Sequence, residues 1–118
     1  MGQPVMQFQI LSKSPEKSAA FYSKLFGWKI DADNALGYRT IKTGSEKGIE
    51  GGIWPCPPEG HAFVQLFIHV TDMARTVEQA KQLGSKVIIP PQKLPDGDEL
   101  AILHDAEGIP FGVYRAKH

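Results

Sequence analysis

The sequence contains an internal duplication. A strand-like segment with a Gln, followed by a helix-like segment, recurs 58 positions later, so that Gln7 corresponds to Gln65 and Ser14 to Asp72. The closing segment recurs 60 positions later, where GIPFGVY (108–114) matches GIEGGIW (48–54). A repeat of this length predicts two similar modules related by a pseudo-twofold axis. Equivalent residues of the two modules should then face a shared cleft.

The length and the charge balance of the chain limit the number of domains and the kinds of partner that we expect. The chain has 118 residues, 42% of them hydrophobic, so we expect one domain. Its modules are expected at about 1–57 and 58–118. A half of this size would be only marginally stable alone, so we expect the two modules to share a core within one chain or to exchange partners between the chains of a dimer. Lys and Arg together number 13, as do Asp and Glu. This balance argues against nucleic acid as a partner, because nucleic-acid binding requires clustered positive charge.

The sequence also predicts the cellular compartment. No segment approaches the roughly 20 apolar residues of a membrane-spanning helix. The N-terminal segment MGQPVMQFQI lacks the basic start and the apolar run of a signal peptide. The single Cys56 allows no internal disulfide, which is typical of a reducing compartment. We therefore expect a cytoplasmic protein that does not bind membranes.

Hydrophobic periodicity predicts the order strand, helix and three further strands in each half. The first half should contain strands at 5–11, 28–32, 37–42 and 48–54. The second half should contain strands at 62–70, 86–89, 99–104 and 109–115. Capping residues place one helix between Ser14 and Gly27 and the other between Asp72 and Gly84. The proline-rich segment 90–98 is expected to be a flexible loop.

Alternation along each first strand separates two faces. One face must cover the helix, and the other should line the concave side of the sheet. The concave side receives Gln7 and Gln9 from the first half, and Gln65, Phe67 and His69 from the second.

Three segments resemble the vicinal oxygen chelate superfamily, which includes glyoxalase I, bleomycin-resistance proteins and extradiol dioxygenases. They are SAAFYSKLFGW (18–28), VTDMARTVEQAKQLG (70–84) and DAEGIPFGVY (105–114). The resemblance extends over nearly the whole chain. Within the superfamily, the chain looks most similar to the small glyoxalase-like subgroup. It implies an α+β fold in which two βαβββ modules form a half-open curved sheet around a cleft.

The resemblance also identifies the positions of a possible metal site. Metalloenzymes of the superfamily hold a divalent metal with His, Glu or Gln side chains from four strands. Carried over, the four positions fall on Gln7, Gln65, Gly52 and Gly112. Two amides and two glycines offer no anion and at most two ligands. Their binding energy would not offset the cost of removing a divalent cation from water. We therefore expect no metal cofactor at these positions.

Other residues could replace the missing ligands. Glu50 shares the face of Gly52, and His69 shares the face of Gln65, so both are candidate metal ligands. His104 lies on a neighbouring predicted strand and is a further candidate. Residues at such positions are more commonly ordinary polar strand residues or, in the case of the histidines, buried neutral side chains. No HExxH or CxxC motif supports a metal site.

The leading hypothesis is a protein that binds a small organic molecule without the usual metal, as bleomycin-resistance proteins sequester a drug. Gln7 and Gln65 would bind an uncharged ligand that carries a carbonyl or amide group. Trp54 and Tyr114 would form an aromatic wall. Gly52 and Gly112 would let the ligand approach the sheet, and His69 would also line the cleft. The sequence leaves it open whether the chain is an enzyme.

Two alternatives involve catalysis. A metal-dependent lyase, isomerase or dioxygenase could use Glu50 and His69 as unconventional ligands. Metal-free acid–base chemistry could use His69, because histidine is the residue type that most often serves as a general acid or base. Fold analogy further predicts a homodimer. The identity of the ligand and of any reaction stays open.

Overall fold

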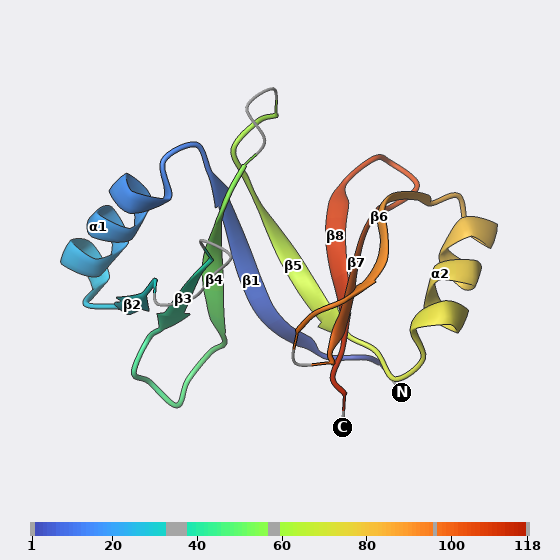
Figure 1. Ribbon diagram of the computed structural model, residues 1–118, viewed down its shortest axis with the longest axis horizontal. Coiled ribbons are helices and arrows are strands. Elements are labelled where there is room, and N and C mark those ends of the chain that lie inside the picture. Colours follow the sequence, from blue (N-terminus) through green and yellow to red (C-terminus); the bar gives the residue numbers. More distant parts are fainter. Residues whose placement is uncertain (1, 33–37, 57–59, 96, 118) are drawn as a thin grey trace. The chain divides into compact units, whose positions relative to one another are not determined.

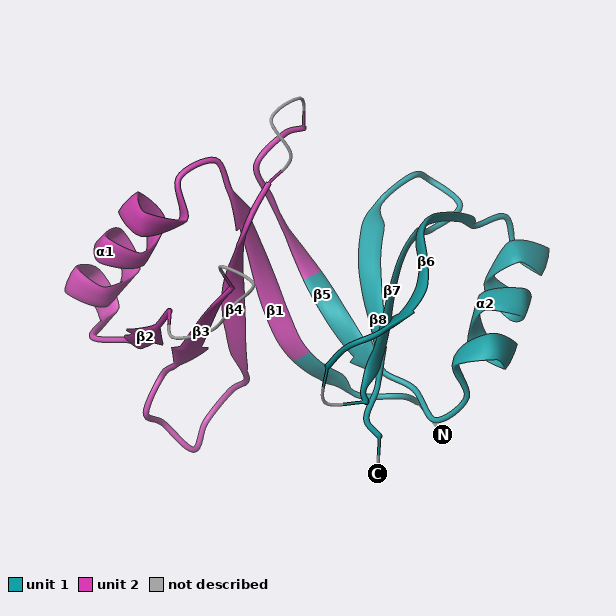
Figure 2. Ribbon diagram, viewed as in Figure 1, with its two compact units in different colours: residues 1–6, 66–118 teal, residues 7–65 magenta. Residues whose placement is uncertain are grey.

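The computed structural model describes residues 2–32, 38–56, 60–95 and 97–117, and within them it contains eight strands and two helices (Figure 1). The chain divides into two compact units (Figure 2). Unit 2 comprises residues 7–65, and unit 1 comprises residues 1–6 and 66–118. The predicted module boundary at 57–58 lies outside the described residues. So do Gly37, Asp96 and His118.

Unit 2 has the order strand, helix and three strands. The elements are β1 (Val5–Ser12), α1 (Pro15–Phe26), β2 (Lys29–Asp31), β3 (Arg39–Lys42) and β4 (Glu50–Pro55). The first two residues of β1 belong to unit 1. The strands lie in the order β2-β3-β4-β1, and β1 runs parallel to β4, while the other pairs are antiparallel.

Unit 1 repeats this connectivity. Its elements are β5 (Phe63–His69), α2 (Met73–Gln82), β6 (Lys86–Lys93), β7 (Glu99–His104) and β8 (Pro110–Arg115). The first three residues of β5 belong to unit 2. The strands lie in the order β5-β8-β7-β6, with β5 parallel to β8. The predicted fold class, α+β with two βαβββ modules, is therefore confirmed.

The two helices begin differently. At α2, the side chain of Asp72 accepts a hydrogen bond of 3.0 Å from the Arg75 N–H, as predicted for an N-cap. At α1, Ser14 occupies the N-cap position, but its side chain makes no capping bond. The Ser12 hydroxyl instead accepts the Ser14 N–H at 3.1 Å and bonds to the Ser18 hydroxyl at 2.6 Å. The prediction of Ser14 as a side-chain cap is therefore wrong.

The helix ends follow the prediction more closely. Gly27 adopts a φ of 72°, and its N–H donates to the Ser23 carbonyl at 2.9 Å. Gly84 follows the end of α2 with a φ of 98°. These values lie in the left-handed region, where glycine has no steric penalty.

The predicted loop at 90–98 needs a correction, because residues 90–93 belong to β6. The pairing of β6 with β7 contains a register shift between Ile89 and Gln92, around Pro90 and Pro91. β6 lies at the end of the strand order, where a proline that cannot donate a hydrogen bond is tolerated. Hence the prolines produce an irregularity and do not end the strand.

Each helix packs on one face of its own sheet. In unit 1, the side chains buried with α2 are Val70, Met73, Val77, Ala101, Leu103 and Val113. In unit 2, α1 has no buried residue and contacts the sheet through aromatic rings. The ring of Tyr22 stacks on Trp28 at 5.3 Å, and Trp28 lies 5.8 Å from Phe8 of β1. The opposite face of the unit 2 sheet is free of α1 and carries polar residues.

Candidate functional site

A row of polar side chains lies on the face of unit 2 that points away from α1. The strand register pairs Gln7 with Glu50 and Gln9 with Gly52, so these four residues share one face. Gln65 joins the row, because its Nε2 donates to Gln9 Oε1 over 3.2 Å. Gln9 is only 7% exposed and Gln65 only 4%. The row therefore contains two neutral amides that are buried together.

Gln65 thus contacts Gln9, a residue that the sequence analysis places on this face without selecting it as a site residue. Alternation could have identified it, since Gln7 and Gln9 share one side of β1. Gln7 is less buried and contacts a different partner, Tyr38.

Tyr38 is a second residue that the sequence analysis does not select. Its ring lies over Gly52, where an added Cβ would collide with it. The ring centroid is 4.7 Å from that of Trp54, and the hydroxyl donates to Gln7 Oε1 at 3.5 Å. Burial raises the pKa of Tyr38, so the hydroxyl stays protonated and can donate at neutral pH. A glycine within a strand was the available signal, because it often marks the close approach of another group.

Two polar atoms on this face are buried and have no hydrogen-bond partner within the described part of the chain. They are Oε1 of Gln65, an acceptor, and Nε1 of Trp54, a donor. An unpaired buried polar group costs about 1–3 kcal/mol, so such atoms are uncommon in folded proteins. One acceptor and one donor inside this face of unit 2 are therefore unsatisfied.

The two predicted site glycines have a packing role. The ring of Tyr38 fills the space beside Gly52, and the ring of Phe67 fills the equivalent space beside Gly112. A Cβ at either position would collide with the ring. Direct contact of these glycines with a ligand stays a prediction.

The remaining predicted residues lie in unit 1. The register pairs Phe67 with Gly112 and His69 with Tyr114, so the four residues share one face. The rings of His69 and Tyr114 are 6.3 Å apart, and the Tyr114 hydroxyl donates to Asp98. Gln7, Gly52, Trp54 and Gln65 lie in unit 2. The common cleft of all seven residues stays a prediction.

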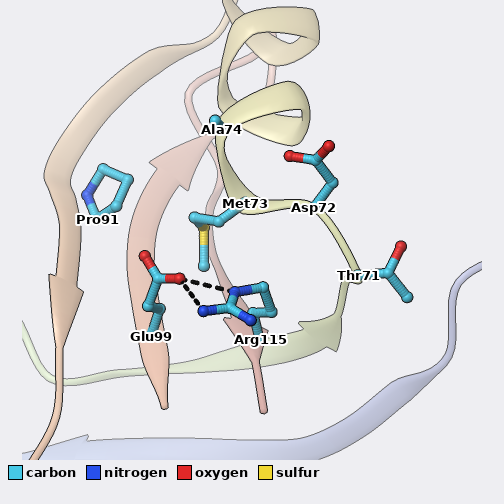
Figure 3. Close-up of a pocket in the computed structure, with 7 residues that line it drawn as sticks. All are labelled: Thr71, Asp72, Met73, Ala74, Pro91, Glu99 and Arg115. Carbon is cyan, nitrogen blue, oxygen red and sulfur yellow. Dashed lines mark hydrogen bonds and ion pairs between the residues drawn. The ribbon is translucent and has the colours of Figure 1, made fainter. Parts of the chain in front are cut away.

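A pocket of about 360 Å³ lies on the other face of unit 1 (Figure 3). The first turn of α2, Pro91 of β6, and a charged pair from β7 and β8 line it. Arg115 Nε donates to Glu99 Oε1 at 2.7 Å, and the two groups form an ion pair. Asp72, also at the pocket, already caps α2. Because its charged groups bond to each other or to the backbone, the pocket is a weaker candidate than the polar face of unit 2.

The donor atoms do not fit a divalent metal. The carried-over positions supply amides and glycines, which contain no anionic ligand. Glu50 is exposed, and the ring of His104 bonds through Nδ1 to the Asp105 carbonyl at 2.7 Å. Across residues 2–32, 38–56, 60–95 and 97–117, no three His, Cys, Asp or Glu side chains are grouped closely enough to hold a metal ion. In the same residues, neither helix has the length and apolar character to cross a membrane.

Comparison with known proteins identifies the family. The model of the glyoxalase-like domain matches residues 7–114. No curated protein matches the sequence.

Solved structures share the fold at low identity. A hypothetical protein of Bacillus halodurans is 16% identical, with a TM-score of 0.71, and the match covers 100% of this chain and 97% of that one. An NAD-dependent benzaldehyde dehydrogenase of Legionella pneumophila is 17% identical over 94% and 98% of the two chains, with a TM-score of 0.68. Methylmalonyl-CoA epimerase of Streptomyces coelicolor is 13% identical over 98% and 99%, with a TM-score of 0.65. The chain therefore belongs to the glyoxalase-like domain family of the vicinal oxygen chelate superfamily.

Proposed function

We propose that this protein binds a small, uncharged organic molecule on the polar face of unit 2 and that it does so without a metal ion. The single observation that supports this proposal most is the row of neutral glutamine amides beside the adjacent rings of Tyr38 and Trp54.

The surrounding residues suit such a ligand. Gln7, Gln9 and Gln65 supply amide donors and acceptors without net charge. Trp54 and Tyr38 supply adjacent aromatic rings, which favour a planar apolar portion of the ligand. This combination of apolar surface and a few polar groups is typical of small-molecule sites.

The metal-dependent alternative has less support. It relies on Glu50 and His69, but Glu50 is exposed, and within the described residues neither side chain belongs to a group of three His, Cys, Asp or Glu side chains that could hold a dication. Stoichiometric metal after purification without metal-affinity resin would contradict the metal-free proposal.

Binding can be tested by NMR on protein treated with a chelator. The sequence contains two tryptophans, so two indole N–H signals are expected. A fragment library of neutral and charged ring compounds should include members that shift the Trp54 signal. The Trp28 signal serves as an internal control, because Trp28 packs against Tyr22 and Phe8 on the opposite side of the sheet. If no neutral fragment shifts the Trp54 signal, the proposed function is wrong.

We further propose a homodimer in the cytoplasm. Phe21, Leu25 and Phe26 of α1 are each more than half exposed, and a second copy could cover them. Sedimentation velocity at several concentrations tests this state, and a monomer at all concentrations would contradict it.

A further inference from the structure

We infer that the pocket of unit 1 is a second ligand site and that it binds a small zwitterion, a molecule with both a free ammonium group and a free carboxylate, such as a dipeptide with apolar side chains. The residues that line this pocket all belong to unit 1, whereas the polar face proposed as the first site belongs to unit 2. The two sites can therefore be tested separately.

An irregularity in β6 builds one wall of the pocket. The register of β6 against β7 shifts between Ile89 and Gln92. Two residues, Pro90 and Pro91, therefore lie opposite a single residue of β7, as in a β-bulge. Pro91 lines the pocket on one side, and the first turn of α2 lines it on another (Figure 3). The volume of about 360 Å³ falls within the range of small-molecule sites, about 300–1,000 Å³.

The ion pair of Glu99 and Arg115 gives the pocket its charged groups (Figure 3). Arg115 contacts one oxygen, Oε1 of Glu99, through both Nε and Nη2. Within the described residues, Glu99 Oε2 and Arg115 Nη1 have no partner. The side chains of Arg115 and Glu99 are 30% and 19% exposed, so a ligand in the pocket can reach both. One acceptor and one donor are thus accessible.

The fold does not require this ion pair. The closing strand of unit 2 has Pro55 where unit 1 has Arg115, yet unit 2 forms the same order of strands. A partly buried ion pair also adds little stability, because the cost of removing two charges from water offsets their attraction. A role in binding therefore accounts for the pair better than a role in folding.

The charge balance of the pocket selects the class of ligand. Asp72 also lines the pocket, but its carboxylate caps α2 through the Arg75 N–H. One cationic and one anionic group are then left for a ligand. A monoanion is attracted by Arg115 and repelled by Glu99, and a monocation experiences the reverse. Only a molecule with both charges gains a charge-assisted hydrogen bond at each group.

The other lining residues indicate the remainder of the ligand. Met73, Ala74 and Pro91 present apolar surface beside the ion pair. Arg115 turns its Nε–Nη2 edge toward Glu99, so its Nη1 lies beyond the guanidinium carbon, on the side away from the carboxylate. The ammonium and carboxylate groups of the ligand should therefore be several bonds apart. A dipeptide with apolar side chains meets both conditions.

The test uses alanyl-leucine and three analogues that differ only at the ends of the molecule. They are the N-acetylated dipeptide, an anion, the C-terminal amide, a cation, and the N-acetylated amide, which is neutral. Binding is followed by NMR at the methyl signal of Met73, which lines the pocket (Figure 3). Alanyl-leucine should bind about tenfold or more tightly than each analogue, because each lacks at least one charge-assisted hydrogen bond. Met6 of β1, which does not line the pocket, is the internal control.

Two variants assign the effect to the ion pair. In Glu99→Gln, acetylation of the amino group should no longer weaken binding. In Arg115→Gln, amidation of the carboxylate should no longer weaken it. Glu78→Gln alters an exposed glutamate of α2 and changes the net charge as much as Glu99→Gln does, but it should retain the wild-type order of affinities. Circular dichroism checks that each variant is folded, and the four wild-type affinities decide if one is not.

Three results would overturn the inference. One is equal or tighter binding of any analogue to the wild type, and another is the absence of a Met73 shift with all four compounds. The third is loss of the tenfold differences in Glu78→Gln, which would reveal an effect of net charge alone. The Trp54 indole signal in unit 2 reports on the proposed function independently of these outcomes.

Discussion

The orientation of the buried amide pair leads to an asymmetric prediction for protein stability. Replacing Gln9 by Met removes the acceptor for Gln65 Nε2, so both polar ends of the Gln65 amide are then unpaired. We expect Gln9→Met to lower the free energy of unfolding by about 1–3 kcal/mol. For a chain of this length, 1 kcal/mol corresponds to a change in Tm of roughly 4 °C.

Replacing Gln65 by Met has two opposing effects. The unpaired Oε1 disappears, which stabilises the protein, but Gln9 Oε1 loses its donor, which destabilises it by a similar amount. The net change in the free energy of unfolding should be close to zero. The double variant Gln9→Met/Gln65→Met removes both amides, and we expect it to be more stable than the wild type by about 1–3 kcal/mol.

Urea unfolding monitored by circular dichroism measures this series, provided that the m-value stays constant. The expected order of stability is the double variant, then the wild type and Gln65→Met together, then Gln9→Met. Gln79→Met should match the wild type, because Gln79 is exposed on α2. If Gln65→Met is the more damaging single substitution, the hydrogen bond runs in the opposite direction and the reasoning is refuted.

Further predictions concern packing, capping and ionisation. Gly51→Ala should destabilise the protein by about 1–3 kcal/mol in urea unfolding, because the added Cβ would collide with a backbone oxygen of β1. Gly2→Ala is the control and should have little effect, since its Cβ would meet no atom within 4 Å. Asp72→Ala should cost about 1 kcal/mol and Ser14→Ala much less, since only Asp72 makes a capping bond; equal losses would contradict this account. Burial raises the pKa of Tyr38 above its usual value of 10.0, so stability should be retained below about pH 10 and lost as the pH rises through the folded-state pKa. Unfolding measured from pH 9 to 11 should show a smaller loss in Tyr38→Phe.

The sequence predicted the connectivity well, because a duplication specifies each module twice. The order of elements in the first half could be checked against the second, and both follow the same hydrophobic alternation. The main error, at 90–93, arose because Pro90 and Pro91 were interpreted as ending a strand. Their position at an edge of the sheet could not be predicted from local sequence.

The caps show a second limit of sequence interpretation. Asp72 and Ser14 occupy equivalent positions in the two modules, but only Asp72 uses its side chain as a cap. Ser12 takes over the role beside α1, since its hydroxyl accepts the N–H of Ser14. Competition between neighbouring hydroxyls depends on backbone geometry, which composition does not reveal.

The candidate site was predicted in part. Alternation placed the correct side chains on one face of β1, but it did not distinguish Gln9 from Gln7 as the partner of Gln65. Tyr38 could not be found by alternation, because it precedes β3 and reaches the site through the space left by Gly52. The choice of Gln9 as the partner of Gln65 and the position of Tyr38 over Gly52 both depend on contacts between residues that are distant in the sequence. A single sequence does not reveal such contacts.

The division of the chain into two units determines where its gene could be cut or rearranged. Residues 1–6 complete the unit formed by 66–118, and the Pro4 carbonyl accepts the His69 N–H at 2.9 Å. A gene cut between the two repeats would therefore separate one of the products from a strand end that it needs. A circularly permuted gene that starts at Gln7 would instead encode each unit as an uninterrupted segment.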